Sequence, residues 1–207
     1  MSSGLSLPPD IAARLKNHAE QSALKDGGWL HLDPQKLQPA AVLVPLVWEN
    51  DQWHLLFTRR TLHLADHSGQ VSFPGGAWEE RDGTLEQTAL REAREEIGID
   101  PASVAVLGKM ARLDMISYFQ VTPVVGVVSW PCSLTLSPVE VARVFSVPLG
   151  WLADPRNYEV RTRTIEDQTL NITYYHDYDG ETIWGATAHS TREFLCLLQY
   201  LTKTISM

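Results

Sequence analysis

Three acidic side chains, Glu92, Glu95 and Glu96, have the spacing in this chain that best suits metal chemistry. On a helix, residues three and four positions apart lie on the same side, so the three carboxylates would project within an arc of roughly 100°. Like charges arranged in this way repel one another unless a cation joins them. Hard divalent cations such as Mg²⁺ or Mn²⁺ prefer oxygen ligands and leave positions open for phosphate oxygens. The spacing therefore predicts a divalent-metal site.

The helix that would present these acids is predicted over residues 85–97, where apolar residues recur at every fourth position. Glu92 and Glu96 fall beside this apolar side, so we expect their carboxylates to be half buried, whereas Arg94 should face solvent. Gly98 supplies the left-handed residue that ends a helix. Half-buried acids need a counter-charge, which a metal ion would provide.

Taken alone, the run from Arg91 to Glu96 would more often be a solvated, charged helix face than a ligand set, because such helices are common. The residues before it favour a functional site. Phe73-Pro74-Gly75-Gly76 predicts a tight glycine turn that closes a strand, and a polar loop then leads into the helix. The joint occurrence of these features indicates function more strongly than any one of them does.

The segment from Gly76 to Ile99 resembles the Nudix box, a helix-borne motif of enzymes that hydrolyse nucleoside diphosphates linked to another group. Gly76 and Arg91 are fifteen residues apart, one more than in the generic box. The extra residue falls in the loop of residues 79–83. It leaves the first glutamate of the generic box without a clear counterpart, and Asp82 is the nearest acid.

The resemblance implies a Nudix fold, which is an α+β structure (an α/β/α sandwich) with a mixed β-sheet and a catalytic loop-helix-loop. It also implies a metal-dependent hydrolase in which Glu92, Glu95 and Glu96 hold Mg²⁺ or Mn²⁺ and Arg91 orients Glu92. The rival class is a Nudix-fold sensor that binds a nucleotide without cleaving it. Loss of the acids would indicate a sensor, and here all three are present, so we expect an enzyme.

The sequence before the box is similar to that of coenzyme A pyrophosphatases. The similarity covers Leu55 to Thr61, with Thr61 where serine or alanine is usual, and His67 to Gly76. The subgroup usually has an arginine where this chain has Ala65, and a guanidinium group there would suit the 3′-phosphate of coenzyme A. The similarity makes coenzyme A or a derivative the expected substrate, and Ala65 keeps the alternative open, which is ADP-ribose, another dinucleotide or a nucleoside triphosphate.

A general base and a set of substrate contacts complete the expected site. Some Nudix enzymes place the base on a loop well beyond the box, which makes Glu140 the candidate; the alternative is that this acid caps a helix. The residues expected to bind substrate lie in the arginine pair, the loop before the box and the glycine turn: Arg59, Arg60, His67, Gly69, Gly75 and Gly76.

Composition bounds the class of protein. With 207 residues, 44% of them hydrophobic, the chain suits one domain, which we place at residues 36–207 after an N-terminal helical extension at residues 1–35. A net charge of −8 argues against a nucleic-acid partner, and no apolar run is long enough to span a membrane. We expect a cytoplasmic protein that acts on a small-molecule nucleotide, and the resemblance allows a homodimer.

The remaining elements follow from apolar patterning and turn residues. Pro8-Pro9-Asp10 and the apolar spacing after it predict an N-terminal helix that ends near Gly27-Gly28. A hairpin is expected from strands 42–48 and 53–58. Further strands are expected at 71–73, 104–113, 121–129, 159–164 and 170–175, and a closing helix at 193–203.

Overall fold

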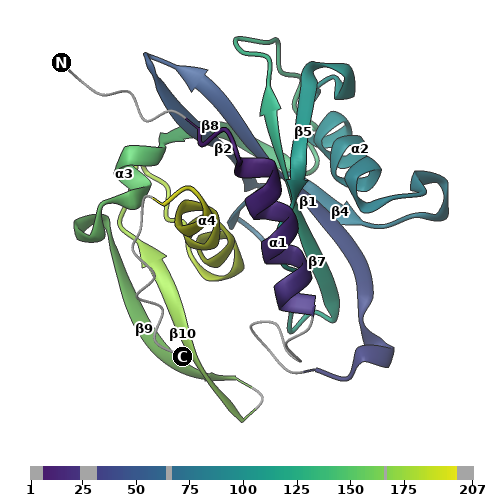
Figure 1. The fold of residues 1–207 in the computed structure, drawn as a ribbon, viewed down its shortest axis with the longest axis vertical. Coiled ribbons are helices and arrows are strands. Elements are labelled where there is room, and N and C mark those ends of the chain that lie inside the picture. The colour runs from purple at the N-terminus through teal and green to yellow at the C-terminus, as the bar shows by residue number, and fades with distance from the viewer. Residues whose placement is uncertain (1–6, 24–31, 64–66, 166, 200–207) are drawn as a thin grey trace.

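A computed structural model describes residues 7–23, 32–63, 67–165 and 167–199 of the chain (Figure 1). Its helices are α1 (Ile11–Ala23), α2 (Leu85–Ile97), α3 (Leu149–Ala153) and α4 (Gly185–Leu197). Its strands are β1 (Gln38–Glu49), β2 (Gln52–Arg60), β3 (Val71–Ser72), β4 (Gly75–Ala77), β5 (Val104–Lys109), β6 (Leu113–Asp114), β7 (Phe119–Val128), β8 (Val141–Pro148), β9 (Tyr158–Ile165) and β10 (Gln168–Tyr175). None of the helices in these residues is long and apolar enough to cross a membrane.

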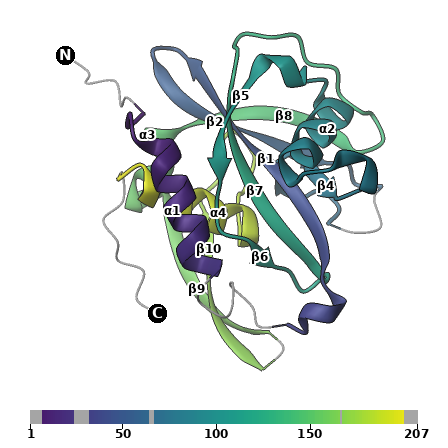
Figure 2. The same ribbon diagram turned by 45° about the vertical axis from the view of Figure 1, so that its right-hand side comes forward.

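The large sheet contains strands in both directions. β1 runs parallel to β7, from Gln38 opposite Phe119 to Leu46 opposite Val127. Along its other edge β1 pairs antiparallel with β4 and then with β2. β2 also pairs with β3 and β8, and β7 with β5 and β6. β9 and β10 form a separate two-stranded ribbon that extends away from this sheet (Figure 2).

Helices cover both faces of the large sheet, with α2 on one face and α1 and α4 on the other (Figure 1). Side chains of β1 alternate between the two layers, so that Leu43 is buried with α2 and Val44 is buried in the larger core beneath α1 and α4. Leu15 of α1 and Phe194 of α4 are fully buried in that larger core. The predicted α+β fold with a mixed sheet between helices is confirmed.

Local sequence sets the first hairpin and the box helix as predicted. Asn50 and Asp51 both have positive φ angles, 49° and 59°, which is the conformation of a two-residue type I′ hairpin turn. The hydroxyl of Thr84 accepts a hydrogen bond from the backbone N–H of Gln87 at 3.2 Å and caps the start of α2. Gly98 ends this helix in the left-handed conformation, with φ of 76°.

The structure corrects two predicted elements. The single strand expected over residues 104–113 is two strands, because β5 shifts register between Val106 and Gly108 and ends at Lys109, and pairing with β7 resumes at Leu113 in β6. The closing helix expected at 193–203 begins earlier, at Gly185. Residues beyond 199, and the expected end of the N-terminal helix at residues 24–28, lie outside the described residues.

β8 is a strand that the sequence patterning did not predict. Val141, Val144 and Val147 are three residues apart, a spacing that suits a helix as well as a strand. Its pairing with β2, in which Phe57 lies opposite Phe145, decides the outcome. Since this partner lies far away in sequence, no local pattern identifies it.

Candidate active site

The glycine segment forms a short strand, β4, where the sequence predicted only a tight turn. Gly76 lies opposite Ala41 of β1 in an antiparallel pair. A Cβ atom on Gly75 would lie 2.4 Å from the carbonyl oxygen of Ala41, and one on Gly76 would lie 2.5 Å from Oε1 of Glu92. Neither gap accommodates a methyl group, so the two glycines allow the backbone to pass directly against β1 and against an acid of α2.

The three acids of α2 differ in their exposure to solvent. Glu96 is buried, with 3% of its surface exposed, and Glu92 is half buried. The Glu95 side chain is 50% exposed, and Arg94 faces solvent as expected. The expectation of two half-buried acids beside the apolar side therefore holds for Glu92, and Glu96 is buried more deeply.

Arg91 connects the loop before α2 to two of these acids. Its Nη1 atom donates to Oε1 of Glu92 at 2.7 Å and to Oε2 of Glu95 at 3.0 Å. Its Nη2 atom donates to the carbonyl oxygen of Ala77 at 2.9 Å, and its Nε atom to Oδ1 of Asp82 at 2.7 Å. The guanidinium group thus fixes the Glu92 carboxylate beside the end of β4.

Asp82 is a structural partner of the site whose role the sequence did not reveal. It is buried, and both of its oxygens accept hydrogen bonds from Arg91. It also accepts from the Thr88 hydroxyl at 2.9 Å and from the backbone N–H of Glu79 at 3.0 Å. The hydrogen bonds from Arg91 hold the pKa of Asp82 well below its usual range. The sequence feature that pointed to Asp82 is that it is the acid nearest to the position of the first glutamate in the generic box.

The three acids expected to bind metal have different partners in the structure. Arg91 pairs with both Glu92 and Glu95. The Nη2 atom of Arg81 lies 3.4 Å from Oε1 of Glu95. Glu96 points instead toward Arg60, with 3.9 Å between Oε1 and Nη1. Among the described residues, no three His, Cys, Asp or Glu side chains lie close enough together to hold a metal ion.

Burial raises the pKa of two acids of this site, Glu92 and Glu96. Desolvation raises the pKa of Glu96 to about 8; Arg60 opposes this shift, and the negative charges of Glu92 and Glu140 add to it. The pKa of Glu92 is also raised, chiefly by burial, although Arg91 lowers it. Without a bound cation, burial and the neighbouring carboxylates therefore favour the neutral, protonated form of Glu96.

Glu140 lies in a turn immediately before β8 and not in a helix, so the helix-capping alternative is wrong. The loop before Glu140 contacts the C-terminal end of α2. The N–H of Thr135 donates to the carbonyl oxygen of Ile97 at 3.0 Å, and the N–H of Ser137 donates to the carbonyl oxygen of Glu96 at 2.8 Å. These two hydrogen bonds place Glu140 near the acids of α2. The Glu140 charge is near enough to raise the pKa of Glu92 and Glu96.

A cavity of about 590 Å³ brings these residues together. Its polar side contains two box acids, the candidate base, one arginine and the loop and strand that precede the box: Glu92, Glu96, Glu140, Arg60, His67, Gln70, Gly75 and Gly76. Its apolar side comes from residues 113–121, from the β9–β10 ribbon and from the start of α4: Leu113, Met115, Ile116, Phe119, Val121, Ile165, Leu170, Ile172 and Trp184. The sequence did not predict this apolar wall or the contribution of Gln70.

The residues expected to bind substrate divide into two groups. Four of them line this cavity: Arg60, His67, Gly75 and Gly76. Arg59 does not line it, because neighbouring residues of a strand face opposite sides, and it lies 3.5 Å from Glu181 instead. Gly69 also does not line it and has φ of 66° in the loop before β3. Ala65 lies outside the described residues.

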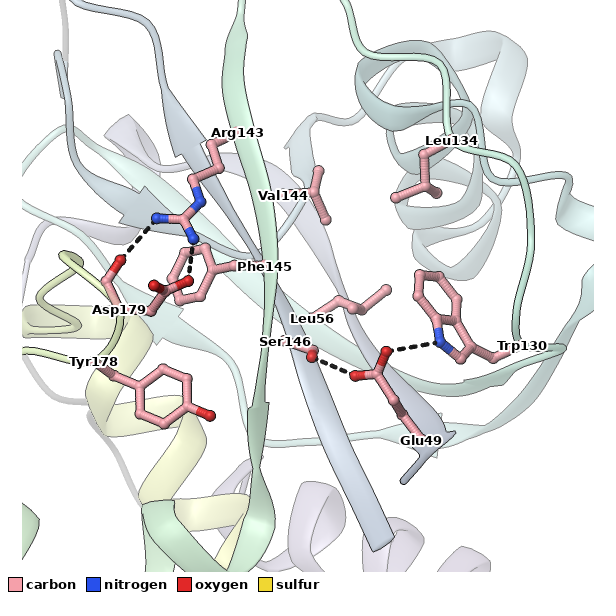
Figure 3. A pocket seen from close by; sticks show the side chains of 10 residues that line it. All are labelled: Glu49, Leu56, Trp130, Leu134, Arg143, Val144, Phe145, Ser146, Tyr178 and Asp179. Atoms are coloured by element: carbon pink, nitrogen blue, oxygen red, sulfur yellow. Dashed lines mark hydrogen bonds and ion pairs between the residues drawn. The ribbon is translucent and has the colours of Figure 1, made fainter. Parts of the chain in front are cut away.

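A second cavity, also of about 590 Å³, lies across β8 and contains none of the acids of α2 among its lining residues. Figure 3 shows Glu49 between Ser146 and Trp130 on one side of β8, and Arg143 paired with Asp179 on the other. Because Arg143 is paired with Asp179 and Glu49 already accepts hydrogen bonds from Ser146 and Trp130, this cavity is a weaker candidate than the one at α2.

Comparisons with known proteins agree with the geometry. A family model described as the NUDIX domain matches residues 37–168. The uncharacterized Nudix hydrolase NudL of Enterobacter sp. (strain 638) is 40% identical over 157 residues, which cover 74% of this chain and 79% of that protein. NudL of Shigella flexneri is 37% identical over 166 residues, covering 79% and 84%.

A solved structure supports the fold. RenU, a Nudix hydrolase from M. smegmatis, superposes with a TM-score of 0.53 at 20% identity, over 82% of this chain and 88% of that one. Together with the family match and the relatives, this likeness leads to one assignment. The chain belongs to the Nudix family and is a Nudix pyrophosphohydrolase.

Proposed function

We propose that this enzyme hydrolyses the pyrophosphate of coenzyme A or its derivatives to 3′,5′-ADP and 4′-phosphopantetheine or its acyl form. The observation that supports this substrate is the cavity that joins Glu92 and Glu96 to an extended apolar wall. Coenzyme A suits this division, because its pyrophosphate adjoins a long pantetheine arm whose methyl and methylene groups can pack on an apolar wall. ADP-ribose would place a ribose against that wall, where its hydroxyl groups would need hydrogen-bond partners.

Nudix hydrolases generally use divalent cations such as Mg²⁺ or Mn²⁺. The residues of this site fit such an ion, because Glu96 is a buried carboxylate whose ion-pair partner, Arg60, is 3.9 Å away. In our proposal Glu92, Glu95 and Glu96 would hold the ion once their side chains turn from the arginine partners seen here toward one another. When bound, it would neutralise pyrophosphate charge and make a water molecule more acidic.

The protein's own groups have separate proposed roles. Arg91 orients Glu92, and Arg60 faces the anionic substrate in the cavity. Glu140 takes a proton from the attacking water as its oxygen bonds to phosphorus and the bridging P–O bond breaks. His67, Gly75 and Gly76 would contact the substrate from the loop and strand before the box.

The organisation of the chain is also part of the proposal. Residues 36–207 would form the hydrolase domain and residues 1–35 an extension that packs onto it through α1. The enzyme would act on small nucleotides in the cytoplasm. The homodimer suggested by resemblance stays a prediction, which sedimentation velocity tests directly.

A substrate panel tests the proposed specificity. With Mg²⁺ present, we expect kcat/KM for coenzyme A and its acyl thioesters to exceed that for ADP-ribose by at least about tenfold, since unpaired sugar hydroxyls against an apolar wall are costly. Phosphate-containing products are measured by chromatography for each compound. Equal or faster cleavage of ADP-ribose would reject the substrate assignment while leaving the family assignment intact.

Gly76→Ala is expected to lower kcat/KM by roughly 100-fold, because displacement of a catalytic group by about 1 Å can have that effect. The added methyl group would lie 2.5 Å from the Glu92 carboxylate and must move it. Gly150→Ala is the matched control, since nothing lies within 4 Å of its added methyl group. Steady-state kinetics and thermal melts are measured for both variants. Equal activity would mean that the observed position of Glu92 is not required.

Glu140→Gln is expected to lower kcat by about 100-fold or more and to remove the acidic limb of the pH–rate profile. Both effects follow if the carboxylate takes the proton, since an amide cannot. Glu20→Gln, an exposed change on α1, is the control for charge alone. A Glu140→Gln variant that keeps the acidic limb would show that another group is the base.

A further inference from the structure

Thr61 stands at the end of β2, immediately after Arg60, and its side chain is buried. Its hydroxyl donates to the carbonyl oxygen of Val139 at 2.6 Å. Its backbone N–H donates to the carbonyl oxygen of Glu140 at 2.9 Å. One residue therefore holds two consecutive carbonyl groups of the turn that presents Glu140.

This turn is also restrained by backbone hydrogen bonds at Ser137, which donates to Glu96 at 2.8 Å and accepts from Val141 at 2.9 Å. Val139 is 68% exposed, so its side chain is not fixed by packing. The ladder between β2 and β8 is irregular at this point, because the register shifts between Arg59 and Arg60. Within the turn itself, the N–H of Glu140 donates to Ser137 at a long 3.2 Å. The short bond from the Thr61 hydroxyl thus supplies a restraint that regular pairing does not.

We propose that Thr61 is a positioning residue, whose hydroxyl fixes the backbone of residues 139 and 140 so that the Glu140 carboxylate stands in the cavity beside the box acids. The inference rests on the proposed role of Glu140. A serine at position 61 would keep the hydrogen bond to Val139. A valine, which has a similar shape to threonine, would lose it.

A double-mutant cycle tests this inference. Thr61→Val is expected to lower kcat about tenfold with KM changed less than about twofold, because a misplaced base affects the chemical step more than binding. Thr61→Ser should recover most of that loss. In a Glu140→Gln background, Thr61→Val should change kcat less than about twofold, because the residue acts through Glu140.

Hydrogen exchange supplies a measurement that does not depend on activity. The backbone N–H groups of Glu140 and Val141 both donate within this turn, to Ser137. Their exchange should accelerate about tenfold in Thr61→Val and return toward the wild-type rate in Thr61→Ser. Thr191→Val is the matched control, since its buried hydroxyl also donates to a backbone carbonyl, that of Thr187 at 2.8 Å. It should leave exchange in the turn unchanged.

The outcomes separate the two proposals. If Glu140→Gln is slow but Thr61→Val keeps wild-type kcat and exchange, the positioning role is wrong and the base assignment stands. If Thr61→Val is as harmful in the Glu140→Gln background as alone, its effect is merely structural and the inference is overturned. If Glu140→Gln is fully active, both proposals fail.

Discussion

Glu96→Gln is expected to lower kcat by about 1,000-fold and, in the metal-free protein, to raise stability above neutral pH. Activity falls because an amide cannot supply the negative oxygen that a divalent cation prefers as a ligand. The fold should survive, because glutamine has nearly the same shape as the buried side chain that it replaces. The substitution should therefore lower activity and raise the stability of the metal-free protein.

The gain in stability follows from the direction of the pKa shift. Burial raises the pKa of Glu96 from 4.5 to about 8. Between these values the folded protein binds a proton that the unfolded chain releases, so the free energy of unfolding falls as pH rises through this window. Glutamine does not titrate. At the upper end of the window the variant should therefore be more stable by on the order of 2 to 3 kcal/mol, or about 4 to 10 °C in Tm.

Calorimetry in EDTA at both ends of this pH window measures the effect. Mg²⁺ provides the control, since it should raise the Tm of the wild-type protein at the upper pH and leave that of Glu96→Gln nearly unchanged. Near-normal turnover of the variant, or identical pH dependence of Tm in the two proteins, would contradict the assignment of Glu96.

Arg91→Ala is the second substitution with a large expected effect, here on stability as well as activity. It leaves the buried Asp82 carboxylate without the guanidinium group that donates to both of its oxygens. We expect a loss of about 2 to 3 kcal/mol, since an uncompensated charge remains in a largely dry position. Tm should fall by about 5 to 10 °C. Activity should also fall, because Glu92 loses its restraint.

Two further variants test whether the loss of stability in Arg91→Ala comes from the broken pair with Asp82. Arg94→Ala removes an exposed arginine from the same helix and should change stability by less than about 0.5 kcal/mol. Adding Asp82→Asn to Arg91→Ala should restore part of the lost stability, because the buried charge is gone, but none of the activity. An Arg91→Ala protein as stable as Arg94→Ala would show that the Asp82 pair does not support the loop before α2.

Local patterns predicted the parts of this molecule that local interactions determine. The box helix, its end at Gly98 and the hairpin at Asn50-Asp51 follow from periodicity and turn residues within a few positions of one another. The buried side of α2 followed in the same way. Composition also indicated one domain, and the resemblance to the Nudix family implied the mixed sheet.

The rest depends on contacts between distant segments. Pairing of β8 with β2 places Glu140 at the site, and spacing alone gave equal support to a capped helix. Helical geometry placed the three acids on one side of α2, but it could not predict that Arg91 binds Glu92 and Glu95 whereas Glu96 faces Arg60. The apolar wall comes from three separate segments that only the tertiary fold brings together.

In our proposal the acids of α2, with a divalent cation, direct hydrolysis to the pyrophosphate of coenzyme A. Mass spectrometry of products from coenzyme A, with and without Mg²⁺ and with Glu96→Gln in parallel, tests it most directly. We predict 3′,5′-ADP and 4′-phosphopantetheine only from the wild-type enzyme with Mg²⁺. Intact coenzyme A under that condition, or the same products from Glu96→Gln at a similar rate, would contradict the claim.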